Sequence, residues 1–119
     1  MLQELRNELL KLKEEGGEIS ECELLAFCMK ETMRMIGFEI FLRHVEEDME
    51  YNGYIIPKNS KVVCSSVSVH YDEKVFPEPL TWNPKRWKNV PSSHFVAFGG
   101  GVHKCKGEVT LFPAFTPLL

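Results

Sequence analysis

The segment Phe98-Gly99-Gly100-Gly101-Val102-His103-Lys104-Cys105-Lys106-Gly107 decides how the rest of this 119-residue chain is interpreted. Three adjacent glycines allow a sharp turn and a close approach to a flat partner, because no Cβ atom intervenes. A cysteine follows the turn, and the residues from Gly107 to Phe112 are predicted to open a helix. The positive end of such a helix favours a thiolate over a thiol. The pattern therefore indicates Cys105 as a metal ligand.

Other interpretations of this segment compete with a metal ligand. A glycine-rich loop that ends in a buried, inert cysteine fits the same residues. A zinc-like site would add His44, His70 and His94 to Cys105, but these histidines lie in different predicted elements without ligand spacing. A phosphate-binding loop is disfavoured, because the lysine and Ser/Thr of that motif do not follow the glycines.

Composition excludes several classes of protein. The chain is 44% hydrophobic and 26% charged with a net charge of -3, so it has no broad basic field for nucleic acid. Acids and bases alternate through residues 1–15, which excludes a signal peptide or a membrane span there. The four cysteines form no C-x-x-C pair, which favours reduced thiols in a protein that faces the cytosol.

Two helices are predicted in the first third of the chain. Leucines at positions 2, 5, 9 and 12 recur at helical spacing, and Gly16-Gly17 ends the helix expected over residues 1–17. Ser20 is predicted to cap a second helix within residues 18–37, with Glu23 completing a capping box. Gly37 marks the end of that helix.

The remaining chain divides into four parts. Residues 38–69 are rich in β-branched and aromatic residues and are predicted to form short strands, with Asn52-Gly53 as a tight hairpin turn. Residues 70–97 carry prolines and little periodicity, which indicates an ordered meander with short helical turns. Residues 98–112 hold the cysteine loop and the start of a helix. Residues 113–119 form an atypical tail, since Pro113 and Pro117 break a helix.

The cysteine segment resembles the signature F-x-x-G-x-[HR]-x-C-x-G of the cytochrome P-450 family, whose fixed positions are met by Phe98, Gly101, His103, Cys105 and Gly107. The resemblance implies haem b as the cofactor and Cys105 as the axial ligand of its iron. It further implies that His103 contacts a haem propionate and that Phe98 packs near the sulfur. No catalytic residue beyond the ligand is identifiable.

Two more motifs strengthen the resemblance. Glu31-Thr32-Met33-Arg34 looks like the family's E-x-x-R, in which spacing i to i+3 places acid and base on one helical face. Trp82-Asn83-Pro84-Lys85-Arg86-Trp87 is similar to the family's meander motif. The resemblance implies a buried structural triad of Glu31, Arg34 and Arg86 that supports the cysteine loop.

The implied fold is an α+β fragment of the mainly α-helical cytochrome P-450 fold, with helices of the J and K type, small antiparallel sheets, the meander, the cysteine loop and a truncated L helix. The implied activity is insertion of one oxygen atom from O₂ into an apolar small molecule. Electrons would come from NADPH through cytochrome P-450 reductase. The stretch His94-Phe95-Val96-Ala97-Phe98-Gly99-Gly100-Gly101 is similar to plant enzymes that oxidise sterols, brassinosteroids and terpenoids.

The chain also departs from the family pattern. The oxygen-activating I helix has no counterpart, so residues 1–119 are expected to be a single incomplete domain. Lys106 and Val102 stand where the family usually has other residues. Family members usually sit on the cytosolic face of the endoplasmic reticulum membrane, whereas this chain has no anchor sequence and is expected in the cytoplasm. The alternative function is a truncated, inactive fragment that at most binds haem weakly or binds another protein.

Overall fold

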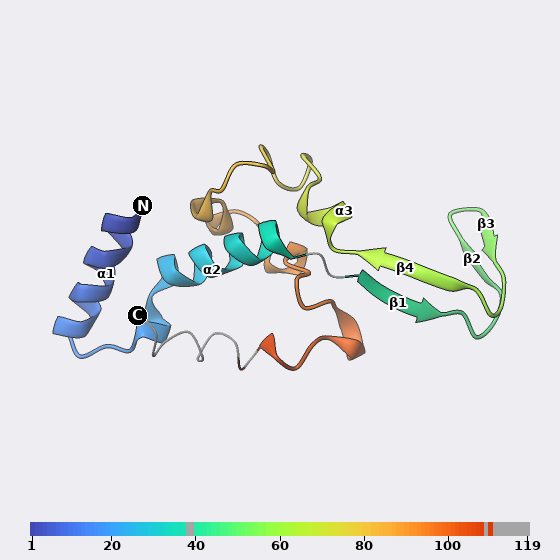
Figure 1. Ribbon diagram of the computed structural model, residues 1–119, viewed down its shortest axis with the longest axis horizontal. Helices are drawn as coiled ribbons and strands as arrows, with labels where there is room; N and C mark the ends of the chain where they lie inside the picture. The colour runs from blue at the N-terminus through green and yellow to red at the C-terminus, as the bar shows by residue number, and fades with distance from the viewer. Residues whose placement is uncertain (38–39, 109, 111–119) are drawn as a thin grey trace.

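The computed structural model describes residues 1–37, 40–108 and 110, and it has an elongated shape of 59 × 29 × 19 Å. Helices lie at one end and a β-hairpin at the other, joined by a second two-stranded sheet (Figure 1). The radius of gyration is 18.0 Å, against about 13–14 Å for a compact domain of this length. The fold therefore leaves much apolar surface without a covering layer.

The first helix, α1 (Leu2–Glu14), lies within the range predicted from the leucine spacing. Leu2 is 83% exposed, and the other three leucines of the stripe are only half-buried. Gly16, at a φ of +74°, takes the left-handed conformation that follows the helix end. An ion pair of 2.7 Å between Glu4 and Lys85 joins α1 to the meander.

The predicted cap of the second helix is wrong. Residues Ile19–Glu21 form a 3-10 turn of their own, so Ser20 lies inside that turn, and its hydroxyl donates to the Glu18 carboxylate at 3.2 Å. The capping box is formed by Glu18 and Glu21. The helix α2 (Glu23–Ile36) begins after Cys22, whose side chain makes no cap hydrogen bond. A local turn therefore displaced the start of the helix by two residues.

Two small antiparallel sheets follow α2. Strand β1 (Ile40–His44) pairs with β4 (Lys61–Ser65), and β2 (Met49–Tyr51) pairs with β3 (Tyr54–Ile56). Asn52 and Gly53 have φ values of +50° and +80°, which confirms the predicted tight turn. Phe38 and Glu39, where the strand-rich region was expected to begin, lie outside the described residues.

The strand prediction fails at its end. Residues Val67–His70 form the short helix α3, and the amide of His70 bonds to the carbonyl of Ser66 at 2.9 Å. Ser66 and His70 are buried, so tertiary packing overrides the β propensity of Val67 and Val69. The meander then contains only the 3-10 turns Pro84–Lys88 and Ser92–His94, in agreement with the expected short turns.

An aromatic cluster forms the core between α2, the meander and the segment before the cysteine loop. Its buried members come from three distant parts of the sequence, and they are Phe27, Phe76, Trp87, Phe95 and Ala97. Met33, Val69, Val75, Val90 and Phe98 pack against it. Burying each large side chain contributes roughly 1.5–3 kcal/mol. This cluster attaches the cysteine loop to the helical end of the molecule.

Candidate functional site

A fully buried carboxylate organises the helical end of the molecule. Glu31 on α2 accepts two hydrogen bonds from the Arg34 guanidinium, at 3.0 and 2.9 Å, and one from Arg86 Nε at 3.0 Å. The backbone amide of Asn83 and the indole Nε1 of Trp87 each donate at 3.0 Å. All five donors therefore converge on one carboxylate, and both of its oxygens are satisfied.

The two arginines extend this cluster to the backbone of the meander. Arg34 donates to the carbonyl oxygens of His70 and Pro79, at 2.7 and 2.8 Å, and its guanidinium lies 5.1 Å from the Phe76 ring centroid. Arg86 donates to the carbonyls of Pro77, Glu78 and Thr81. The planar, forked guanidinium suits such multiple contacts. The three charged side chains thus join α2 to the end of α3 and to residues 77–87 of the meander.

The ionised state of Glu31 is favoured by its partners. Burial alone would raise the pKa of the Glu31 carboxyl, because it disfavours the charged form. The hydrogen bonds from Arg34 and from the Asn83 amide, together with the charges of Arg34 and Arg86, outweigh burial and hold the pKa below its ordinary value. The cluster is therefore a charged one near neutral pH.

The cysteine loop follows the aromatic cluster and projects from it. Gly99 and Gly101 have φ values of +72° and +66°, and a Cβ at Gly99 would lie 3.2 Å from the Phe41 ring. The Cys105 amide donates to the Phe98 carbonyl at 2.9 Å, which closes the loop. A Cβ atom at position 107 would lie 3.3 Å from the Cys105 sulfur, so glycine there leaves the sulfur room.

The Cys105 side chain is exposed, which excludes the alternative of a buried, inert cysteine. His103 is also exposed, in the 3-10 turn Gly101–His103, and Lys104 forms an ion pair with Glu108. A Cβ atom placed at Gly100 or Gly101 would have no neighbour within 4 Å among the described residues. Within the part of the chain that the structure describes, open space therefore lies beside the loop. Residues 109, 111 and 112 of the helix predicted from Gly107 to Phe112, and the whole tail, fall outside the described residues.

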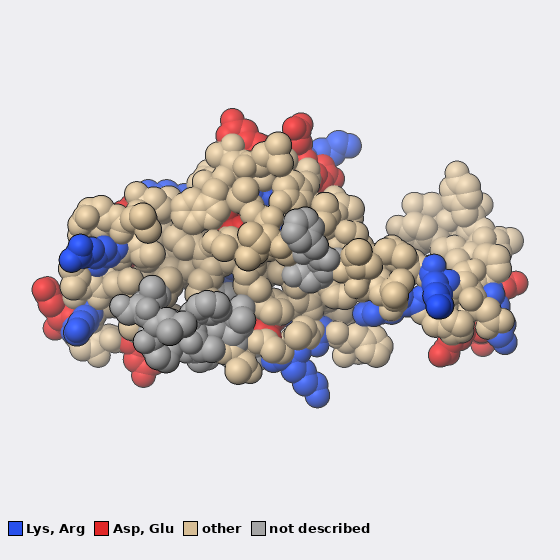
Figure 2. Space-filling view, viewed as in Figure 1, with Lys and Arg blue, Asp and Glu red and all other residues tan. Residues whose placement is uncertain are grey.

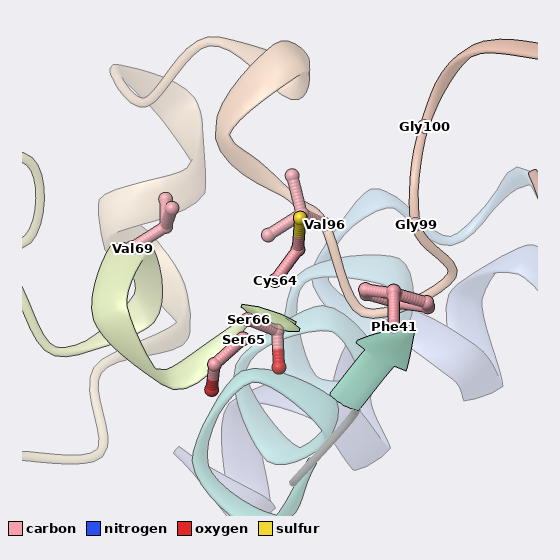
Figure 3. A pocket seen from close by; sticks show the side chains of 8 residues that line it. All are labelled: Phe41, Cys64, Ser65, Ser66, Val69, Val96, Gly99 and Gly100. Atoms are coloured by element: carbon pink, nitrogen blue, oxygen red, sulfur yellow. The ribbon is translucent and has the colours of Figure 1, made fainter. Parts of the chain in front are cut away.

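A cavity of about 210 Å³ lies where the glycine turn meets the β1–β4 sheet (Figure 3). The Phe41 side chain lies against the turn at Gly99, and Val69 and Val96 approach from the other side. The lining is formed by Phe41, Cys64, Ser65, Ser66, Val69, Val96, Gly99 and Gly100. The loop thus has an apolar hollow on its inner side and an open outer side.

The structure brings only part of the predicted site together. Arg34 and Arg86 both donate to the carboxylate of Glu31. Phe98 is half-buried at the edge of the aromatic cluster, with its ring centroid 6.0 Å from that of Phe95. Cys105 and His103 lie apart from the charged cluster, on the exposed loop. The Asn83 amide and the Trp87 indole were not predicted as donors to Glu31. The available signal was the position of Trp87 directly after Arg86 in the sequence.

The histidines proposed for a zinc-like site have other surroundings. His44 is exposed at the end of β1, His94 closes a 3-10 turn, and His70 is buried and accepts a hydrogen bond from the Val96 amide at 3.2 Å. Within residues 1–37, 40–108 and 110, no group of three or more His, Cys, Asp or Glu side chains is arranged to hold a metal ion. None of the helices in this part of the chain is long and apolar enough to cross a bilayer.

The structure thus has an exposed cysteine on a glycine turn and, apart from it, a buried Glu-Arg-Arg cluster. The chain belongs to the cytochrome P-450 family, because the profile of that family matches residues 2–109. Charged side chains are scattered over the viewed face without a broad patch of one sign (Figure 2). The family uses haem, and an exposed thiol beside open glycine backbone fits a flat macrocycle with a thiolate ligand.

Curated plant proteins are similar over most of the chain. Ent-kaurenoic acid oxidase 1 of Arabidopsis thaliana is 39% identical over 84% of this chain and 22% of its own length. Taxane 10-beta-hydroxylase of Taxus cuspidata is 36% identical over 88% of this chain and 24% of its own length. The chain therefore spans about a quarter of the length of the curated relatives it matches.

Proposed function

We propose that this chain forms the proximal haem-binding part of a haem-thiolate monooxygenase, with Cys105 as the iron ligand. The exposed position of the Cys105 sulfur on an open glycine turn carries the proposal. Family membership implies oxidoreductase activity of this kind in general. A bound haem would supply oxygen activation, which an axial thiolate promotes.

The other loop residues have supporting roles in this proposal. His103, exposed two residues before the ligand, would bind a haem propionate. Gly101, at a positive φ, would let the backbone approach the cofactor, and Gly107 leaves room beside the sulfur. Phe98, which packs against the aromatic cluster, would limit access of water to the sulfur, and exclusion of water tunes a thiolate site. Glu31, Arg34 and Arg86 would hold the meander on α2, which we assign as the K helix, with α1 as the J helix.

The proposed substrate is an apolar polycyclic molecule of the terpenoid or sterol class, oxidised with electrons from NADPH through a reductase. Support comes from two relatives, which are named for ent-kaurenoic acid and for taxanes. In the family these reactions take place at the endoplasmic reticulum, which we propose as the location of the activity. The groups that would orient substrate above the haem have no counterpart in the sequence. We therefore propose that residues 1–119 alone bind haem without oxidising substrate.

The test of ligation is the spectrum of the chain with added haemin, reduced under carbon monoxide. We expect the red-shifted Soret band of a thiolate complex, and we expect Cys105→Ala to abolish it. Cys64→Ala is the matched control, because Cys64 is also an exposed, free cysteine, on β4. A band that survives in Cys105→Ala, or is missing in the unmodified chain, contradicts the proposal.

A second assay separates binding from turnover. The haem-loaded chain is incubated with cytochrome P-450 reductase, NADPH and ent-kaurenoic acid, and the products are analysed by mass spectrometry. We expect no oxidised product above a control without the chain. Formation of product would show that residues 1–119 suffice for oxidation.

A further inference from the structure

Trp87 connects the buried charged cluster to the aromatic core. Its indole Nε1 donates to Glu31 Oε2 at 3.0 Å, and this hydrogen bond is buried. The same ring packs against Phe76 and Phe95, with centroid distances of 5.5 and 5.4 Å and interplanar angles of 62° and 86°. One side chain therefore contacts both the carboxylate and the aromatic core.

The aromatic contacts continue from Trp87 to the cysteine loop. Phe95 packs edge-to-face on Phe98, with 6.0 Å between the ring centroids. The carbonyl of Phe98 accepts the amide hydrogen of Cys105 at 2.9 Å. A continuous series of direct contacts thus leads from Glu31 through Trp87, Phe95 and Phe98 to the backbone of Cys105.

The hydrogen bond fixes the orientation of the Trp87 ring. An indole has a single donor and no acceptor, so only one placement of the ring satisfies the Glu31 carboxylate. Packing alone tolerates small rotations of an aromatic ring, whereas a buried bond to a charged acceptor penalises them. The other indole, Trp82, bonds to the hydroxyl of Thr32 at 3.3 Å in an exposed position. Its ring is in none of the aromatic contacts described above for Trp87, Phe95 and Phe98, so Trp82 provides a natural comparison.

We propose that Trp87 is a positioning residue for the cysteine loop: its N–H bond to Glu31 fixes the ring on which Phe95 and Phe98 pack, and so holds Cys105 in place. This inference deepens the proposed function and rests on it for the role of Cys105. Coupling along these contacts predicts local loosening at Cys105, whereas a general loss of stability loosens the whole chain.

The test is amide hydrogen exchange on the haem-free chain with Trp87→Phe, which keeps an aromatic ring and removes the donor. We expect the Cys105 amide to exchange at least about tenfold faster, since a buried bond to a charged group contributes a factor of that order to local opening. The amides of the β1–β4 ladder should keep their rates. Trp82→Phe should leave the Cys105 rate unchanged.

Two further measurements keep the proposal open to refutation. Phe95→Leu interrupts the series of aromatic contacts beyond Trp87, so it should also speed exchange of the Cys105 amide. If Phe95→Leu speeds this exchange and Trp87→Phe does not, aromatic packing alone holds the loop, and the proposed role of the Trp87 N–H is wrong. If Trp87→Phe does not fold, native-state exchange of the unmodified chain replaces it. The Trp87 indole and the Cys105 amide should then exchange in one opening event, with one dependence on denaturant, and separate events refute the coupling.

Haem binding is measured separately, so the two proposals fail in distinguishable ways. If the chain binds no haem but Trp87→Phe speeds exchange at Cys105 alone, the proposed function is wrong and the positioning role of Trp87 stands. A chain with the thiolate spectrum, in which Trp87→Phe leaves Cys105 exchange unchanged or speeds all amides equally, refutes the positioning role alone.

Discussion

Replacing Glu31 with glutamine tests how much the buried charged cluster stabilises the fold. The substitution preserves the shape of the side chain but removes its charge and turns one acceptor oxygen into an NH₂ group. In the structure Oε1 receives donors from Arg34, Asn83 and Arg86, and Oε2 receives donors from Arg34 and Trp87. The amide nitrogen must therefore face at least two donors.

The expected loss of stability follows from these contacts. With the NH₂ group at the Oε2 position, the bonds from Arg34 Nε and Trp87 Nε1 are lost. Removing one charged partner of a buried ion pair lowers the free energy of unfolding by about 3–5 kcal/mol, because the other charge stays buried without a counter-ion. Arg34 is fully buried, so water cannot replace the missing partner. Since small domains are stable by only about 5–15 kcal/mol, the variant should be close to unfolding.

The assay is urea unfolding, followed by tryptophan fluorescence and by circular dichroism, for the unmodified chain and Glu31→Gln. The matched control is Glu4→Gln, because Glu4 also pairs with a cation, Lys85, but in an exposed position. Exposed ion pairs contribute little, so its unfolding midpoint should stay nearly unchanged. A loss below about 1 kcal/mol for Glu31→Gln would contradict the reasoning, because it would mean that the cluster is not needed as a charged unit.

The remaining predictions concern pH and the glycine turn. Because the pKa of Glu31 is lowered in the fold, its contribution to stability is complete above the pKa of an unfolded glutamate, about 4.3, and is lost as pH falls through the lower folded value. The urea midpoint of Glu31→Gln should therefore depend less on pH below about 4 than that of the unmodified chain, and parallel curves would contradict this. Gly99→Ala should lose more stability than Gly16→Ala. Both glycines have a positive φ, which costs an alanine about 1–2 kcal/mol. Only a Cβ atom at position 99 would also approach the Phe41 ring, at 3.2 Å. Equal losses in urea unfolding would show that the ring moves aside without cost.

The bend of the cysteine loop was predictable because its motif is local in the sequence. The positive φ values at Gly99 and Gly101 agree with the expectation that glycines bend the chain before Cys105. The Asn52-Gly53 turn was predictable for the same reason, since its backbone conformation depends on two adjacent residues. The roles assigned to Cys105 and His103 in binding haem stay predictions until the spectrum is measured.

The errors arose where neighbouring residues compete for the same backbone groups. Ser20 has the chemistry of a helix cap, but the box of Glu18 and Glu21 forms a separate turn first. Val67 and Val69 favour strands by propensity, but burial of the adjacent Ser66 and His70 places them in a helix. Propensity is a weak prior that tertiary packing readily overrides.

The sequence alone determined a family resemblance, a cysteine loop, and an acid and two bases that this resemblance joins in a buried triad. Only the tertiary structure decided that the Asn83 amide and the Trp87 indole complete the shell around Glu31, and that an aromatic series runs from there to Cys105. The physical reason is that spacing places residues on one helical face, whereas contacts between residues some 50 positions apart depend on how the meander packs.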